Sequence, residues 1–109
     1  MLARVWCTMD LLKIHSAVRW GKPVDELKSL GLKDQAAADA QDEKNGNAAL
    51  HIAVQNGHLE IVNFLVGELN CSVDLQNKVG NTALHMGVEY DYYKINQVLV
   101  AAGADLSSF

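Results

Sequence analysis

The sequence predicts an all-α fold, a solenoid of stacked helix-turn-helix units joined by hairpin-like turns. The main observation is an internal repeat, in which GNAALHIAVQNGHLEIVNFLV at residues 46–66 returns as GNTALHMGVEYDYYKINQVLV at residues 80–100. His51 and His85 give the offset of 34 residues (85 − 51), and a fixed period of this length is typical of stacked repeat proteins. In the first copy, the dipeptide Asn56-Gly57 marks a tight turn between two short apolar segments.

The composition favours one globular domain. Of the 109 residues, 50% are hydrophobic and 20% are charged, which is the balance of a folded protein rather than a disordered one. The net charge of −4 argues against a nucleic-acid surface, because binding to phosphates requires clustered Lys and Arg. No run of about 18 apolar residues is present to span a membrane. We therefore expect no nucleic-acid partner and no membrane partner.

The cysteines and the first residues bear on location. Residues 1–9, MLARVWCTM, form too short and too broken an apolar run for a secretory signal. Cys7 and Cys71 lie far apart without a repeating spacing, so we expect two reduced thiols that act as small buried apolar groups. These features predict an intracellular, cytoplasmic protein, with the nucleus as an alternative.

The chain begins with residues 1–8, which lie outside the repeat and are expected to form either a frayed extension or an extra strand. A first helix is predicted from Met9 to about Arg19, because apolar residues and a histidine recur there at helical spacing, namely Leu11, Leu12, His15 and Val18. Gly21 breaks this helix.

A second helix is predicted to start at Pro23, whose ring suits a first helical position. It runs through Leu27 and Leu30 to Gly31, which is a good left-handed cap. Residues 32–41, LKDQAAADAQ, show no clear period and are predicted to be a connector.

The repeated part predicts a turn, a short helix, a tight turn and a longer helix. In the first copy the turn at residues 42–47 carries Asn45-Gly46, a strong hairpin signal. Helices follow at residues 48–56 and 59–69, and Asn70 is expected to end the longer one in a left-handed conformation. The same cycle then returns, with a turn at residues 77–81, helices at residues 82–90 and 92–102, and Gly103 as the last turn residue.

Short motifs in both copies indicate a family. With TALH at Thr82–His85, GHLEIV at Gly57–Val62 and AGADL at Ala102–Leu106, the sequence resembles the ankyrin repeat family. The resemblance covers residues 42–106 well, and residues 11–41 match more weakly as a first repeat.

The resemblance implies a division of the chain into repeats. We expect an N-terminal extension at residues 1–8 and a degenerate first repeat at residues 9–41, which serves as an N-terminal cap. The second repeat is expected at residues 42–76, and the third repeat with a short C-terminal tail at residues 77–109.

The sequence departs from the family pattern at several positions. Ala48-Ala49 stands where the family usually has Thr-Pro. In the third repeat Gly87 replaces a small Ala and Asn96 replaces an apolar residue. Leu69 resembles a one-residue insertion, which explains the spacing of 34 rather than about 33 residues.

The residues that could carry chemistry are better explained as structural. His15, His51 and His85 recur at the same place in successive repeats, which favours an imidazole hydrogen-bonded to turn backbone, as the family uses it. His58 follows the turn glycine and is also expected to be structural. No zinc-ligand spacing, nucleophile elbow or phosphate-binding glycine loop is present. We expect no enzymatic activity, no catalytic residues, no cofactor and no metal.

A row of variable residues is the candidate partner surface. The pairs at the end of each short helix occupy matching places and should line up in a stack: Arg19-Trp20, Gln55-Asn56 and Glu89-Tyr90. The turn tips should extend this surface through Lys44, Asn45, Asn47, Lys78, Val79 and Asn81. Trp, Tyr and Arg are the commonest binding hot spots, and the resemblance implies a concave recognition face here. In the alternative interpretation, Trp20 packs against the N-terminal extension and Tyr90 covers the Tyr92-Tyr93 turn.

These observations predict a non-enzymatic protein-protein interaction module that binds a partner protein, of unknown identity, through its concave helix face and turn tips. The alternative is an assembly piece, either a fragment of a longer ankyrin array or a chain that associates end to end with itself. That alternative depends on apolar surface left open at the C-terminal end by Met86, Val88, Val98 and Phe109.

Overall fold

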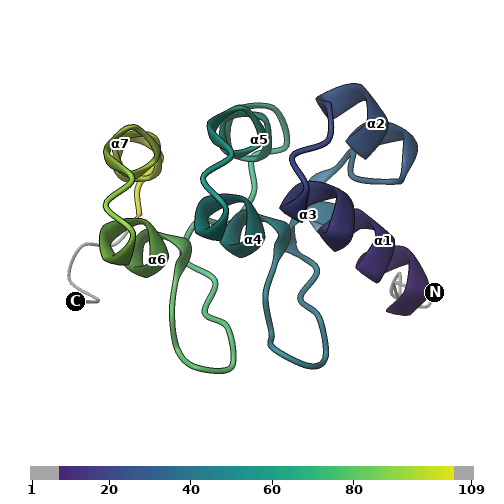
Figure 1. Ribbon diagram of the computed structural model, residues 1–109, viewed down its shortest axis with the longest axis horizontal. Coiled ribbons are helices and arrows are strands. Elements are labelled where there is room, and N and C mark those ends of the chain that lie inside the picture. Colours follow the sequence, from purple (N-terminus) through teal and green to yellow (C-terminus); the bar gives the residue numbers. More distant parts are fainter. Residues whose placement is uncertain (1–7, 105–109) are drawn as a thin grey trace.

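The helices lie in two rows, one above the other, along the longest dimension of the molecule (Figure 1). The computed structural model describes residues 8–104 and measures 36 × 26 × 22 Å. The lower row holds α1 (Thr8–Arg19), α4 (Ala49–Gln55) and α6 (Ala83–Glu89). The upper row holds α2 (Val24–Ser29), α5 (Leu59–Asn63) with its continuation η1 (Phe64–Glu68), and α7 (Tyr93–Ala101). This arrangement confirms the predicted all-α solenoid.

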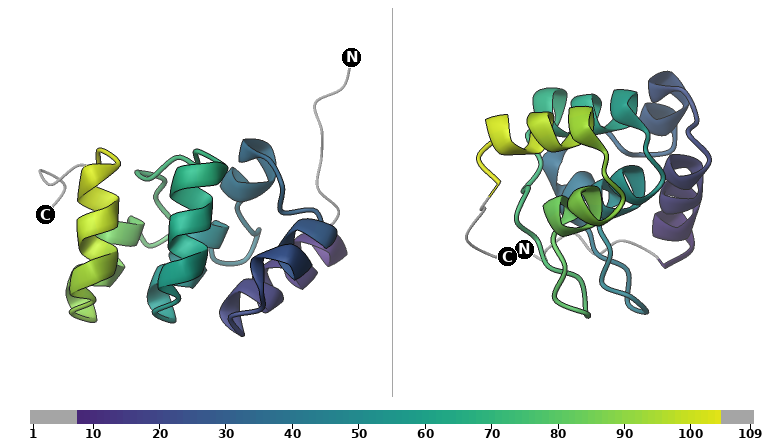
Figure 2. Two further views of the ribbon diagram at one scale, coloured as in Figure 1. Left: turned by 90° about the horizontal axis from the view of Figure 1, so that it is seen from above. Right: turned by 60° about the vertical axis from the view of Figure 1, so that its left-hand side comes forward.

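Two long loops leave the stack on the same side and lie next to each other (Figure 2). Residues 40–48 join α3 (Gln35–Asp39) to α4, and residues 69–82 join η1 to α6. They contain the two predicted hairpin-like turns. Most of the predicted N-terminal extension, and Asp105–Phe109 with the predicted C-terminal tail, lie outside the described residues.

The predicted tight turn after α4 is present, and both turns between paired helices contain a residue with left-handed backbone. Gly57 has a φ of 72°, a conformation that glycine adopts without steric penalty. Asp91 occupies the same place after α6 with a φ of 59°, and aspartate is one of the few other residues that tolerate it. Asn70 ends the longer helix of the second pair with a φ of 53°, as predicted.

The extra residue near Leu69 is absorbed by a π-helical turn. The amide of Leu69 donates to the carbonyl of Phe64 at 3.1 Å, a bond across five residues rather than four. The helix ends of the two copies confirm the insertion, because the cap amide of Cys71 reaches back six residues to Leu65, whereas the amide of Ala104 reaches back five to Leu99. The longer helix of the second pair therefore holds one more residue than its counterpart.

The connector predicted for residues 32–41 is wrong in part, because it contains the short helix α3. A carboxylate oxygen of Asp34 accepts a hydrogen bond from the amide of Ala37 at 2.8 Å and so caps the helix. Three alanines follow this cap, and they favour helix. The segment is too short for a periodic apolar pattern, so only the cap and the alanines could have revealed it.

Two further details of the first helix pair differ from the prediction. Leu12 is 52% exposed rather than part of the buried stripe of α1, and Ile14 is buried instead. Pro23 is the N-cap residue of α2, one position before the helix that it was predicted to start.

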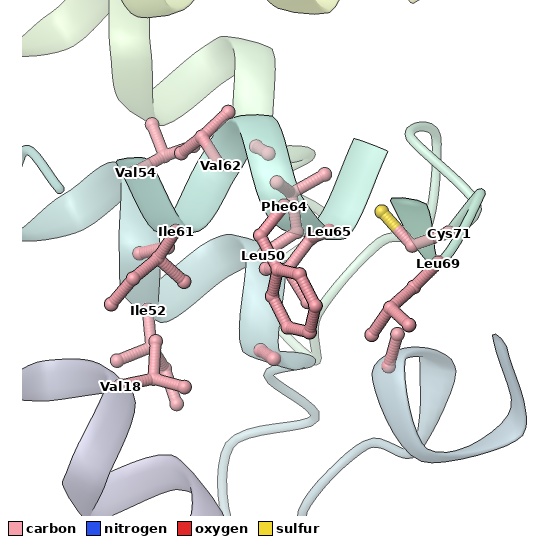
Figure 3. Close-up of a cluster of buried hydrophobic side chains, with 14 of the residues drawn as sticks. Val18, Leu50, Ile52, Val54, Ile61, Val62, Phe64, Leu65, Leu69 and Cys71 are labelled. Atoms are coloured by element: carbon pink, nitrogen blue, oxygen red, sulfur yellow. The ribbon is translucent and has the colours of Figure 1, made fainter. Parts of the chain in front are cut away.

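The core runs along the stack between the two rows and from each pair to the next (Figure 3). Leu50, Ile52 and Val54 of α4 lie among the residues of α5 and η1, and Val18 reaches them from α1. Each such side chain contributes roughly 1.5–3 kcal/mol on burial. The helices of the lower row, α1, α4 and α6, pack in series, and the small buried residues Ala49, Ala53 and Ala83 allow close approach.

Gly87 and Asn96 are two separate departures from the family pattern in the sequence, but the two residues are packed against each other in the structure. A Cβ atom at Gly87 would lie only 2.0 Å from the side-chain oxygen of Asn96. That oxygen is buried and has no hydrogen-bond partner among the described residues. The missing methyl group of Gly87 therefore provides the space that the larger polar side chain occupies.

We predict that Gly87→Ala lowers the free energy of unfolding by about 1 kcal/mol, measured by urea denaturation. The methyl group would improve helix preference by roughly 1 kcal/mol, but overpacking against Asn96 costs roughly 1–3 kcal/mol. Adding Asn96→Val, which recreates the Ala53 and Val62 pair of the second copy, should raise the stability above that of wild type. The matched control is Gly67→Ala in η1, where an added Cβ meets no atom within 4 Å and should be stabilising. If Gly87→Ala stabilised the protein as much as Gly67→Ala does, the close packing of Asn96 against Gly87 would be contradicted.

Candidate functional site

The two loop tips are each shaped by one side chain at their base. A carboxylate oxygen of Asp42 accepts hydrogen bonds from the amides of Asn45 and Gly46, the latter at 2.9 Å. In the second loop, the side-chain oxygen of Asn77 accepts from the amides of Val79 and Asn81, both at 3.0 Å. These Asx-type bonds add to the backbone bonds within each loop and hold each tip in a defined shape.

The tips are also bonded to each other. The backbone amide of Lys78 donates to the carbonyl of Asn45 at 3.0 Å, and its ammonium group donates to the carbonyl of Glu43. The side-chain amide of Asn77 donates to the side-chain oxygen of Asn47 at 3.1 Å. Gly46 permits this approach, because a Cβ atom there would lie 2.8 Å from the amide nitrogen of Lys78. The two loops therefore form one continuous wall.

His51 ties this wall to the helices. Its Nδ1 accepts from the amide of Ala48 at 3.0 Å, and its Nε2 donates to the carbonyl of Asn81 in the next loop at 3.0 Å. The Nδ1 of His85 accepts from the amide of Thr82 in the same way, at 3.0 Å. The predicted structural role of these two histidines is confirmed. His58 is structural as well, since its Nε2 donates to the carbonyl of Arg19 at 2.8 Å.

His15 lacks the predicted, well-formed hydrogen bonds to turn backbone that His51 makes, although the backbone of Ala40 lies close enough to its ring to oppose the lowering of its pKa. It is buried, and neither ring nitrogen has a hydrogen-bond partner among the described residues. The reason is its place in the helix. His51 is the third residue of α4 and reaches a free amide at the helix start, whereas α1 begins seven residues before His15 (15 − 8). The nearest charged group is the Asp42 carboxylate, 3.9 Å from Nδ1.

A groove of about 740 Å³ lies between the wall and the ends of the short helices. Its floor includes Gln55 and Asn56 at the end of α4, and Met86 and Tyr90 from α6. The rings of Tyr90 and Tyr92 lie with centroids 5.8 Å apart, and Tyr92 packs over Gly57. Arg19 lines the end of the groove at α1, and the loop tips line its side.

The groove contains nine of the twelve candidate residues predicted from sequence: Arg19, Lys44, Asn45, Asn47, Gln55, Asn56, Lys78, Val79 and Tyr90. Asn77, Met86 and Tyr92 also line it and were not predicted. Asn77 carries a local signal that could have been used, because an asparagine at the base of a turn commonly bonds the turn amides. Met86 and Tyr92 have no such signal in the sequence.

Three predicted residues lie outside this groove. Trp20 is 75% exposed and lines a separate hollow of about 370 Å³ on the α1 and α2 side, with Leu12 and Leu30 among its neighbours. Asn81 contributes its carbonyl to His51, and Glu89 is exposed at the end of α6. The predicted row of groove residues therefore does not include Trp20, which was expected at one end of it. The alternative position for Trp20, against the N-terminal extension, involves residues outside the described range.

Other reactive groups do not form a site in the described part of the chain. Cys71 is buried, and burial, with the nearby Asp39 carboxylate as a second cause, raises the pKa of its thiol to about 12. Cys7 lies outside the described residues. Between residues 8 and 104, no group of three or more His, Cys, Asp or Glu side chains could hold a metal ion. No helix in that range is long and apolar enough to cross a membrane.

We predict that the free energy of unfolding falls as the pH is lowered from about 6.5 to 4, by about 3 kcal/mol through His15 alone. Burial lowers the pKa of His15 to about 4, against the opposing effect of Asp42, and burial also lowers the pKa of His51. Because the folded pKa lies below the unfolded value of 6.5, the unfolded chain binds more protons in this range.

The test is urea denaturation of wild type, His15→Gln and His58→Gln across this pH range. The His15→Gln variant should lose less stability on acidification than wild type, whereas His58→Gln, which leaves the buried imidazoles in place, should follow the wild-type slope. If the free energy of unfolding fell equally steeply with pH in wild type and His15→Gln, the pH dependence would not come from His15.

The arrangement of helices and loops agrees with comparisons to known proteins. A scan of family models matches residues 14–109 to ankyrin repeats, in three copies. A search of curated proteins finds none that matches the sequence. The family match spans most of the chain, and the stacked helix pairs with projecting loops have the corresponding architecture. The chain therefore belongs to the ankyrin repeat family.

Proposed function

We propose that this chain is a non-enzymatic module that binds a partner protein in the groove between the loop tips and the short helices. Ankyrin repeats are generally protein-protein interaction modules and are typically non-enzymatic. The observation that carries the proposal is that variable residues from all three helix pairs gather in one groove of about 740 Å³.

The groove combines a rigid frame with variable side chains. Positions that hold the fold are the same in both copies, as with His51 and His85, whereas Gln55 and Asn56 are replaced by Glu89 and Tyr90. The frame is held by hydrogen bonds between the loops before any partner arrives, so little conformational entropy should be lost on binding. Tyr90 and Arg19 are of the residue types that most often dominate binding energy.

The proposal includes the division into repeats. We place the repeats at residues 9–41, 42–76 and 77–109, after an extension at residues 1–8. The helix pairs α1 and α2, α4 and α5, and α6 and α7 support these boundaries. The free, buried thiol of Cys71 supports the proposed intracellular, cytoplasmic setting.

We predict that Asn56→Ala combined with Tyr90→Ala weakens binding of a partner by about tenfold or more, which corresponds to loss of a hot spot. The partner is first isolated by affinity capture from native extract and identified, and its affinity is then measured by calorimetry. Circular dichroism should show a helical signal close to that of wild type, because both side chains are exposed and Asn56→Ala removes only one side-chain bond, to the carbonyl of Ile52 at the end of α4.

The matched control is Trp20→Ala, which removes a larger exposed aromatic side chain outside the groove. It should leave the affinity unchanged. If the groove variant binds as well as wild type, the assignment of the groove is wrong. A loss confined to Trp20→Ala would move the binding surface to the hollow beside α1 and α2.

A second candidate function, self-association at the C-terminal face, is favoured by one comparison within the chain. Val54 of α4 is fully buried because α6 packs on it, whereas its counterpart Val88 in α6 is 52% exposed. Tyr93 and Val100 of α7 are exposed as well. The proposed occupant is a second copy of the chain, which would continue the stack through the same kind of helix packing. The alternative, a further repeat of a longer array, would use the same face.

For this second function, we predict that light scattering shows a molar mass rising above 11.9 kDa with increasing concentration. Val88→Lys combined with Tyr93→Lys should remain monomeric, because two charges on the packing face would have to lose their hydration. A wild-type chain that stays monomeric at high concentration would contradict self-association and leave the groove proposal unaffected.

A further inference from the structure

The groove has a charge opposite to that of the whole protein. The chain carries 13 acidic and nine basic residues, with a net charge of −4. Among the residues that line the groove, three are cationic, five carry side-chain amides and none carries a carboxylate. The three cations come from different elements: Arg19 from α1, and Lys44 and Lys78 from the two loop tips.

The cations of the groove are not neutralised by their neighbours. No carboxylate among the described residues forms an ion pair with Arg19, Lys44 or Lys78, whereas Lys28 on the opposite row pairs with Glu68 at 2.7 Å. Neither Asp42 nor Glu43 of the first loop forms an ion pair with these cations through its carboxylate. The carboxylate of Asp42 holds the turn amides, and Glu43 presents its backbone carbonyl to the ammonium group of Lys78.

The bond between Lys78 and Glu43 positions a charge without removing it. A backbone carbonyl is a neutral acceptor, and a lysine ammonium group has three N–H donors. One donor is used by Glu43, so two remain for a ligand. Because this long side chain is already held at the tip, less rotamer freedom is lost when a ligand binds.

The remaining groove surface suits a polypeptide segment. The amide side chains of Asn45, Gln55 and Asn56 line the groove with the cations, and side-chain amides offer donors and an acceptor that can bond a peptide backbone. Asn56 keeps one N–H donor and its oxygen for this purpose, since its other N–H donates to the carbonyl of Ile52 at 2.9 Å. Tyr90, Tyr92 and Met86 supply an apolar end. Three cations on a protein of net negative charge are few for a nucleic-acid backbone, which requires a broad basic surface.

We propose that the groove binds an acidic segment of the partner protein, with Asp or Glu side chains against Arg19, Lys44 and Lys78 and an apolar side chain against Tyr90 and Tyr92. This inference rests on the proposed function of the groove and adds the chemistry of the partner to it. The carboxylates provide attraction and orientation, and the tyrosine end provides the apolar contact.

The test is a selection of short random peptides, displayed on phage, against the wild-type chain. Enriched peptides should be rich in Asp and Glu, should contain an apolar or aromatic residue, and should shift the amide resonances of the groove in NMR spectra. Their affinity should fall as salt is added, because exposed charges are screened. Lys44→Glu combined with Lys78→Glu should weaken them by about tenfold or more.

The matched control is Lys13→Glu combined with Lys22→Glu, which changes the net charge equally but alters the hollow beside α1 and α2. It should bind the acidic peptides as wild type does. Groove-bound peptides without an acidic preference would overturn this inference and leave the proposed function intact. Peptides that shift resonances only outside the groove, or no enrichment at all, would count against both. Duplex DNA that displaces the peptides from the groove, and binds more tightly, would overturn the choice of a protein ligand.

Discussion

Each helix pair in this molecule depends on the next one to cover its apolar side. Val54 and Val88 occupy the same place in successive pairs, yet the first is fully buried and the second is half exposed, because among residues 8–104 only the first has a packed neighbour on that side. The core is therefore continuous along the stack rather than enclosed within any one pair (Figure 3). Small residues such as Ala49, Ala53 and Ala83 keep the short helices close. The row of helix ends that forms the groove floor follows from this spacing.

The loops acquire their shape from the same stacking. His51 accepts a bond from the start of its own helix and donates one to the following loop, so two neighbouring pairs must be packed before both bonds can form. The loop tips then bond each other through Lys78 and Asn77. As a result, the side of the groove is fixed mainly by backbone and core interactions, and the side chains of Lys44 and Val79 remain exposed along it. A stable frame with interchangeable side chains is the physical basis for the binding function proposed above.

Places where the copies differ show how the frame tolerates change. The extra residue of the second pair is taken up by η1 without altering the helix end at Asn70. In the third pair, the loss of a methyl group at Gly87 makes room for the amide of Asn96. His15 keeps the residue type of its counterparts but not their hydrogen bonds, since α1 extends well before it and leaves no free amide within reach. In each case the packing of the neighbouring helices is retained while a local interaction changes.

The sequence by itself determined the elements whose signals are local or periodic. The 34-residue offset, the turn residues Gly57 and Asn70, and the variable pairs at the helix ends were sufficient to predict the stack and most of the groove. This worked because a regular stack places matching positions in a row. Only the tertiary structure decided the position of Trp20 outside the groove, the contribution of Tyr92, and the lack of well-formed hydrogen bonds from His15 to the described residues. These features depend on the direction of a side chain relative to neighbouring helices, and that direction is set by packing between units rather than by spacing along the chain.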